Sequence, residues 1–244
     1  MIFSNLNKCY VHDNFIDGEV WIPQENFKDL QNVLERISVG DQTLPVKFYN
    51  VADNDAKPPT YIKTNEFTWA FQEIVNTYGI PRYREINPAL FNIVTFPFLF
   101  GVMFGDIGHG LLLFLFGLYL VFNKNELMNG DSALKPIVKA RYLLTMMGFF
   151  AFFNGWMYND FLSMPLGIFG TCYINKGAVA VRQDENCVYP VGLDPKWYVA
   201  SNELAFFNSL KMKISVIFGV SQMTFGKGYL IIRNMPSRYK CSLL

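Results

Sequence analysis

The sequence predicts a mainly α-helical membrane protein with about four bilayer-spanning segments and a partial α/β segment at its cytosolic N-terminal end. Residues 86–123 and 140–162 are almost free of charged side chains, whereas residues 1–85 have an ordinary charged composition. The first apolar run is nearly twice the roughly 20 residues that one helix needs to cross a bilayer. The net charge of +1 is not the clustered basic excess of a nucleic-acid-binding surface, so no nucleic-acid partner is expected.

Residues 1–62 are expected to form part of a cytosolic arm that ends in a linker. EVWIP at 19–23 and LPVKFY at 44–49 have the composition of short strands, and residues 27–38 between them carry a helical apolar spacing. Asn26 is placed to cap that helix. Strand, helix and strand are typical of an α/β domain. The piece is too short for a core of its own, so we expect partners or further residues to complete it.

Residues 63–85 are expected to form an amphipathic helix and the approach to the membrane. Thr64 or Asn65 can cap the helix, and Gly79 can end it. One apolar stripe is made by Phe67, Ala70, Phe71, Ile74, Val75 and Tyr78. Two interpretations remain open: the stripe packs on the soluble lobe, or it lies on the membrane surface.

The long apolar run is predicted to hold two spans, at about 88–105 and 108–123. Its only Asp and its only His lie in FGDIGHG at 104–110, so the chain is expected to reverse there. Its glycines, which permit a tight reversal, are Gly105, Gly108 and Gly110. Each arm is short, which implies local bilayer thinning or burial against other helices.

Two further spans are expected, at about 140–162 and 212–232, with a long loop at 163–208 between them. The fourth span is the weakest by composition, because Gln222 and Lys227 interrupt it. We therefore expect that helix to face protein rather than lipid.

The orientation follows from the distribution of Lys and Arg, which are enriched on the cytosolic side of a membrane. Basic residues are dense before the first span, in the connection 123–141 and in the tail 233–244. These parts and the N-terminus are predicted to be cytosolic, and the tip 104–110 and the loop 163–208 to face the lumen. The exceptions to this rule are Lys211 and Lys213.

The four cysteines are scattered and form no CxxC pair. Cys9 and His12 have a spacing seen in metal ligands, but no second pair completes a tetrahedral site, so no metal or other cofactor is expected. No phosphate-binding glycine loop and no Ser/His/Asp set occurs, which argues against nucleotide binding and catalysis by this chain. Cys172 and Cys187 share the predicted luminal loop, where a disulfide between them is possible.

Several long stretches resemble the subunit a family of the vacuolar-type proton-pumping ATPases. The most specific are REINP (84–88), PFLFGVMFGDIGHG (97–110), YNDFLSMPLGIFG (158–170) and YPVGLDPKWYVASNELAFFNSLKMKISVIFG (189–219). The resemblance runs from about residue 17 to about residue 228.

The resemblance implies a non-catalytic subunit of the proton-translocating membrane sector. In that family a cytosolic arm serves as stator, and eight membrane helices face a rotating ring of proteolipid subunits. They supply two half-channels and an essential Arg. The implied partners are the proteolipid ring, other membrane-sector subunits, the peripheral stalk subunits through the N-terminal segment, and the bilayer. The implied location is a vacuolar or other acidic endomembrane.

The chain also departs from the family pattern. It is much shorter, it lacks the late helices that carry the Arg, it has Gln222 where the family usually has His, and residues 234–244 show no resemblance. We expect a fragment or a truncated form that conducts no protons alone. The alternative is a non-conducting membrane scaffold or assembly factor of the same complex.

Asp106, His109 and Asp160 are the candidate proton-path residues. Ionisable side chains within a membrane protein are costly and mark ion pathways. Both aspartates fall at the predicted luminal ends of spans, and an ordinary histidine titrates at the pH of an acidic lumen. The alternative is structural: Asp106 caps the turn or the second span, and His109 bonds to a backbone carbonyl. Both interpretations also apply to Asp160.

Overall fold

The computed structural model describes residues 7, 9–12, 15–40, 58–83, 85–129, 134–176, 179–184 and 186–234. They fall into two compact units, residues 1–63 with 81–85, and residues 64–80 with 86–244. The chain is mainly helical with a little sheet, as the sequence predicts.

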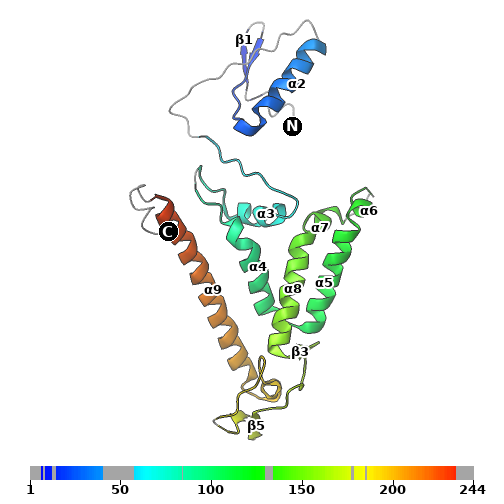
Figure 1. Cartoon of the computed structure of the whole chain (residues 1–244), viewed down its shortest axis with the longest axis vertical. Coiled ribbons are helices and arrows are strands. Elements are labelled where there is room, and N and C mark those ends of the chain that lie inside the picture. Colours follow the sequence, from blue (N-terminus) through cyan, green and yellow to red (C-terminus); the bar gives the residue numbers. More distant parts are fainter. Residues whose placement is uncertain are drawn as a thin grey trace. The chain divides into compact units, whose positions relative to one another are not determined.

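The first unit pairs a hairpin with one helix (Figure 1). Strands β1 (Tyr10–His12) and β2 (Phe15–Asp17) are antiparallel, and α2 (Phe27–Gly40) follows a 3-10 turn, η1 (Gln24–Asn26). The strand expected at 19–23 does not form, because a ladder needs a partner and no described strand pairs with it. Asn26 lies inside η1 instead of capping the helix. The strand expected at 44–49 lies outside the described residues.

In the second unit, α3 (Trp69–Tyr78) is the predicted amphipathic helix. The middle of its stripe, Ala70, Phe71 and Val75, is buried, and the helix contacts α4 (Ala89–Met103) and α8 (Arg141–Tyr158) of the same unit, whereas Tyr78 at the end of the stripe is exposed. Asn87 Nδ2 donates to Gln72 Oε1 at 2.6 Å, which ties α3 to the residues that lead into α4. The helix begins later than expected, because residues 66–68 form a turn first. It ends as expected at Gly79, whose N–H donates to the Val75 carbonyl.

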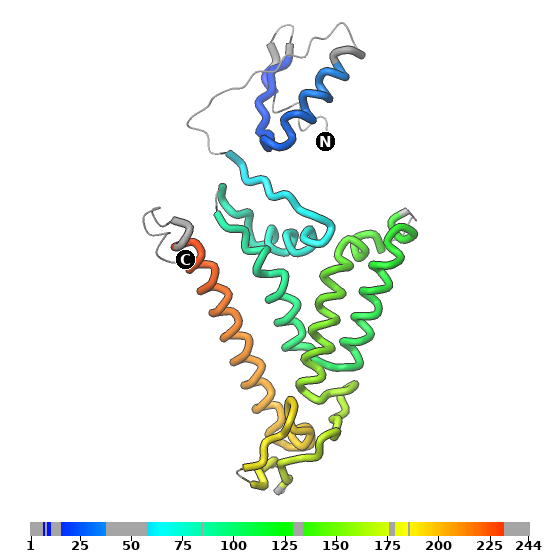
Figure 2. The backbone as a smooth tube through the Cα atoms, viewed as in Figure 1, coloured from blue at the N-terminus to red at the C-terminus, as the bar shows by residue number. Residues whose placement is uncertain are grey.

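The apolar run folds into α4 and α5 (Ile107–Phe122), with the reversal confined to residues 104–106. Helix α8 lies between α4 and α5 and packs on both, as Figures 1 and 2 show. Two short helices, α6 (Lys124–Asn129) and α7 (Lys135–Lys139), lie in the connection from α5 to α8. The arms of the predicted hairpin therefore pack on a third helix between them.

The glycines after the reversal have a different role from the one expected. Gly108 and Gly110 lie in the first turn of α5 rather than in the bend. A Cβ at Gly110 would meet the backbone nitrogen of Phe152 at 2.3 Å, and one at Gly148 would meet the backbone nitrogen of Phe114 at 2.4 Å. Because neither neighbour is the end of a flexible side chain, α5 and α8 can approach this closely only where the side chain is absent.

Helix α9 spans Glu203–Asn234, 32 residues. Among the described residues it is the one helix long and apolar enough by itself to cross a membrane, whereas α4 and α5 are apolar but shorter. It begins at Glu203, well before the expected start near 212, and residues 203–211 form its first turns. The Phe218 ring stacks on that of Phe98 in α4 at a centroid distance of 4.3 Å.

Residues 159–202 connect α8 to α9 and carry two small hairpins. These are β3 (Asp160–Phe161) with β4 (Met164–Pro165), and β5 (Tyr173–Lys176) with β6 (Val179–Arg182). Before α9 comes the 3-10 helix η2 (Pro195–Val199). The disulfide between Cys172 and Cys187 is present, with the two Cα atoms 5.7 Å apart. Asp194 Oδ2 accepts the Cys172 N–H at 2.7 Å, which anchors the bridged segment to η2.

Candidate functional site

Asp106 is the cap of α5 and the centre of the candidate site. Its Oδ1 accepts the N–H of Gly108 at 2.9 Å and the N–H of Leu162 at 2.9 Å. The first bond closes the N-terminus of α5, and the second joins the reversal to the segment after α8. Gly155 makes this approach possible, since a Cβ there would lie 2.3 Å from the Asp106 carbonyl carbon. Asp106 is therefore buried, at 8% relative exposure.

His109 lies one helical turn after Asp106, and its Nδ1 contacts Asp106 Oδ2. The partner of the imidazole is thus the carboxylate rather than a backbone carbonyl. The ring itself is largely exposed, with 69% of the side-chain surface accessible. The pair consequently joins a buried carboxylate to a group that reaches the outside of the molecule.

Asp160 lies just beyond the end of α8, in β3. It accepts the backbone N–H of Ser163 and senses the negative charge of Asp106. Its Oδ1 is buried and has no hydrogen-bond partner among the residues that the structure describes. The structure thus brings all three predicted site residues to one end of the helices α4, α5 and α8.

The two carboxyl groups have opposite pKa shifts. Burial opposes ionisation of Asp106, but hydrogen bonds from His109, Leu162 and Gly108 outweigh it, so the pKa of Asp106 is lowered. Burial and then the negative charge of Asp106 raise the pKa of Asp160. Asp106 therefore stabilises the reversal above its unfolded pKa, and this contribution is lost only as pH falls through the lower folded value. Asp160 is the carboxyl that takes up a proton first on acidification.

The structure adds Lys211, near the start of α9, to the candidate site. Its Nζ donates to the Met103 carbonyl at 3.2 Å and lies 5.2 Å from the centre of the Tyr158 ring. Its positive charge also acts on Asp160. In the sequence, Lys211 appears only as an exception to the charge rule for orientation. The Met103 carbonyl and the Asp160 carboxyl group therefore stabilise a positive charge at this end of the helices.

Tyr158 and Tyr198 also join the elements around the site. The Tyr158 hydroxyl donates to the Val102 carbonyl at 3.0 Å, and the Tyr198 hydroxyl donates to the Tyr158 carbonyl at 3.2 Å. The three residues come from α4, α8 and η2. Sequence reasoning misses Tyr158 and Tyr198 because nothing in the neighbouring sequence distinguishes them from the other tyrosines of the chain.

Comparison with known proteins gives consistent matches over most of the chain. The V-type ATPase 116 kDa subunit family matches residues 1–242. The chain is 38% identical over 274 aligned positions to the V-type proton ATPase 116 kDa subunit a 2 of Homo sapiens. The alignment covers 99% of this chain and 31% of the relative. It is 42% identical over 210 residues to the vacuolar proton translocating ATPase 100 kDa subunit of Dictyostelium discoideum. That alignment covers 84% of this chain and 26% of the relative.

A third relative is the V-type proton ATPase 116 kDa subunit a 1 of Xenopus tropicalis, 35% identical over 258 residues, with 96% of this chain and 31% of the relative covered. The chain thus spans about a third or less of the length of these curated relatives. The matched residues include both units of the fold and all three candidate site residues. The chain belongs to the V-type ATPase 116 kDa subunit family.

Proposed function

We propose that the chain is a non-catalytic part of the proton-translocating membrane sector of a V-type ATPase, in a vacuolar or other acidic endomembrane. Its bilayer-spanning segments are α4, α5, α8 and α9. Its partners are the proteolipid ring, other membrane-sector subunits and, through the N-terminal segment, the peripheral stalk. Family membership supports this assignment, because the relatives are named as subunits of proton-translocating ATPases.

The exposed apolar surface of the second unit supports a membrane setting. Many large apolar side chains on α5 and α9 are exposed, among them Leu112, Leu115, Phe122, Val216, Met223 and Phe225. So many exposed large apolar side chains on two helices are unfavourable in water, and we expect lipid or other subunits to cover them. Helices α4 and α5, with 15 and 16 residues, are about 22–24 Å long at 1.5 Å per residue. They fall short of the roughly 30 Å hydrocarbon core, which implies local thinning or cover by neighbouring subunits.

The observation that carries the site is the contrast between two neighbouring carboxyl groups: both oxygens of Asp106 have partners, whereas the buried Oδ1 of Asp160 has none among the described residues. Their opposite pKa shifts agree with this contrast, which separates a proton-exchanging group from a fixed charge. In the proposed role, Asp160 binds and releases the proton. Asp106 stays ionised and holds the reversal together. His109, in contact with Asp106 and exposed on its other side, passes protons toward the lumen.

The proposed orientation places residues 159–202 in the lumen and the connection from α5 to α8 in the cytosol. Ile168→Cys should react with a membrane-impermeant maleimide from the lumen only, and Lys135→Cys from the cytosol only. Ile168 is exposed, at 52%, and each variant serves as the opposite control for the other. Sealed vesicles of both orientations, labelled before and after permeabilisation, give the measurement. Labelling of Ile168→Cys from the cytosolic side overturns the orientation.

The proposed proton role is tested with Asp160→Asn and Asp106→Asn in assembled complexes that contain this chain. Asn keeps the size and hydrogen-bonding capacity of Asp but cannot ionise, so both variants should fold while proton pumping falls. The double variant should lose less than the sum of the two single losses, because both groups serve one site. Asp184→Asn is the matched control: it removes an exposed carboxylate from the same connecting segment and should leave pumping unchanged.

The measurement is the acidification rate normalised to assembled ATPase. Unchanged pumping in both single variants and the double variant would favour the second candidate function, a non-conducting scaffold or assembly factor. One observation favours this alternative: both oxygens of Asp106 are used in contacts that hold the turn, with Gly108, Leu162 and His109. In that case Asp106→Ala should reduce assembly, since Ala removes the cap, while Asp106→Asn should not.

A further inference from the structure

A second polar cluster lies in the same unit, at the junction of the turn before α3, the start of α6, and the facing ends of α7 and α8. A cavity of about 310 Å³ opens there, lined by Thr64, Asn65, Glu66, Trp69, Lys124, Met128, Lys139 and Arg141. Three of these side chains are cationic and one is a carboxylate, so the lining has an excess of two positive charges. None of its residues belongs to the candidate proton site.

Glu66 neutralises only part of the positive charge that lines the cavity. Lys124 Nζ donates to both Glu66 oxygens, at 2.5 and 2.7 Å, and Arg141 Nη2 donates to Oε2 at 2.6 Å. The hydrogen bond from Lys124 is the largest effect on the pKa of Glu66 and lowers it. Burial opposes this, but the charge of Lys124 and the hydrogen bond and charge of Arg141 also lower the pKa, so the net shift is downward. The carboxylate therefore stays ionised, and both of its oxygens are used by two of the three cations.

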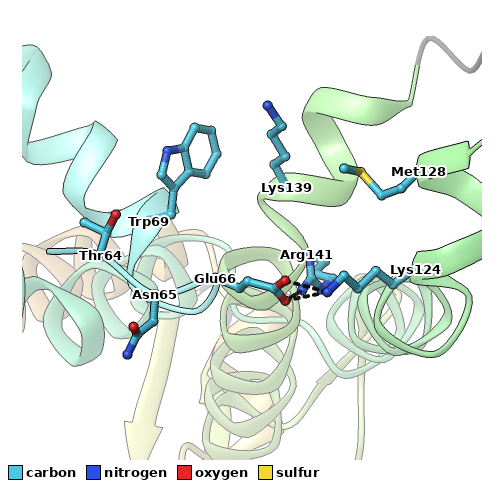
Figure 3. Close-up of a pocket in the computed structure, with 8 residues that line it drawn as sticks. All are labelled: Thr64, Asn65, Glu66, Trp69, Lys124, Met128, Lys139 and Arg141. Carbon is cyan, nitrogen blue, oxygen red and sulfur yellow. Dashed lines mark hydrogen bonds and ion pairs between the residues drawn. The ribbon is translucent and has the colours of Figure 1, made fainter. Parts of the chain in front are cut away.

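The third cation and one buried donor remain available in the cavity. Lys139 Nζ lies 5.6 Å from the centre of the Trp69 ring and forms no ion pair with any carboxylate that the structure describes. Figure 3 shows Trp69 and Lys139 apart from the group formed by Glu66, Lys124 and Arg141. Arg141 is only 4% exposed, yet its Nε has no hydrogen-bond partner within the described part of the chain. A buried charged donor without an acceptor is costly, so an acceptor from outside the chain fits this position.

The position of Arg141 adds to the attraction for anions. It is the first residue of α8, an 18-residue helix, and the N-terminus of a helix carries a partial positive charge and unpaired N–H groups. The guanidinium presents donors in a planar fork that matches phosphate geometry. Three other lining residues, Thr64, Asn65 and Trp69, have hydroxyl, amide and indole N–H donors.

We propose that this cavity binds a terminal phosphate group between Lys139 and Arg141. The source is the phosphomonoester headgroup of an anionic membrane lipid or free inorganic phosphate, which share a phosphate with at least three unesterified oxygens. The lipid source rests on the proposed function: in the proposed orientation the cavity lies at the cytosolic face, where anionic lipids are concentrated and basic pockets between membrane helices bind their headgroups. Trp69 suits that depth, because its ring is amphipathic.

The experiment uses the purified chain in neutral detergent and has two arms. In the lipid arm, native mass spectrometry compares retention of added phosphatidic acid, a phosphomonoester, with retention of phosphatidylcholine. In the free-anion arm, the thermal unfolding temperature is measured with inorganic phosphate and with chloride at equal ionic strength. Preferential retention of phosphatidic acid, or stabilisation by phosphate, is expected to depend on Lys139.

The variants separate the cavity from general charge attraction. Lys139→Gln should lower the selective binding about fivefold, the change expected for one Lys facing an anionic headgroup. Lys139→Arg keeps the charge and should keep the binding. Lys135→Gln is the matched control: it makes the same charge change on the same short helix, α7, but does not line the cavity, and it should leave binding unchanged. Lys139 is exposed and makes no ion pair with a described residue, so its replacement should not unfold the chain.

The outcomes distinguish the sources and can overturn the proposal. Selective lipid retention without an effect of phosphate assigns the site to a lipid headgroup, and the reverse assigns it to a free anion. Equal losses of binding in Lys139→Gln and Lys135→Gln, or no selectivity in either arm, overturn the proposal. The cluster is then only a structural ion-pair network in which Glu66 joins Lys124 to Arg141. The assay measures neither orientation nor pumping, so its failure and that of the proposed function are separate results.

Discussion

Replacing Gly110 by Ala is expected to lower the free energy of unfolding of the second unit by about 1–3 kcal/mol, the usual cost of forcing an extra carbon into a packed interface. The new Cβ would lie 2.3 Å from the Phe152 nitrogen and 2.7 Å from the Ala151 carbonyl carbon. Both are backbone atoms and cannot rotate away. Helices α5 and α8 would therefore have to separate, which also weakens the neighbouring contact of Gly148 with Phe114.

The matched control is Gly219→Ala in α9. Apart from the adjacent residues and backbone of α9 itself, no atom of the described residues lies within 4 Å of a Cβ built at that position, so the same substitution meets open space. Ala is favoured over Gly in a helix by about 1 kcal/mol, and the control should be unchanged or slightly more stable. Thermal unfolding of both variants in the same detergent, followed by circular dichroism, gives the comparison. Equal unfolding temperatures would show that the contact between α5 and α8 has little energetic importance.

Loss of the Cys172–Cys187 disulfide is expected to destabilise the segment between α8 and α9 by about 3 kcal/mol. The bridge closes a loop with a sequence separation of 15 residues, and the cost follows from the entropy that the cross-link removes from the unfolded segment. A change of this size corresponds to about a hundredfold increase in the population of the opened segment. Limited proteolysis of the Cys172→Ser, Cys187→Ser double variant should accelerate by a similar factor, with cleavage between β5 and η2.

Two controls accompany this measurement. A reductant should accelerate cleavage of the native chain to the rate of the double variant and should leave the double variant unchanged. Cys9→Ser, in the first unit, should cleave at the native rate in this segment. If the double variant is cleaved no faster than the native chain, the hydrogen bonds of Asp194 to the backbone of Cys172 and Lys196 suffice to hold the segment.

The features that the sequence predicts correctly depend on neighbours along the chain. Gly79 ends α3 because only its own helix is involved, and the reversal after α4 follows from a polar break in an apolar run. The cap at Asp106, one of the two interpretations that the sequence left open, spans two residues. The disulfide joins cysteines within one connecting segment. Local hydrophobicity, capping and chain reversal are therefore sufficient for these assignments.

Where a prediction fails, the deciding contact comes from elsewhere. The strand expected at 19–23 has the right composition but no strand beside it. The sequence predicts that the glycines of FGDIGHG shape a bend, yet the backbone of α8, about forty residues further on, is what leaves no room for a side chain at Gly110. Glycine is required equally by a turn and by a close helix contact, so its presence alone does not distinguish the two.

By itself the sequence determined the helical class, the apolar segments, the positions of the charged residues among them and the family resemblance, because these depend on composition and local spacing. Only the tertiary structure placed α8 between α4 and α5, brought Asp160 to Asp106, and joined Glu66 to Lys124 and Arg141 across 58 and 75 residues. Such contacts form when elements distant in the sequence pack together. Their geometry is set by which side chains allow close approach, and no local pattern of the chain encodes it.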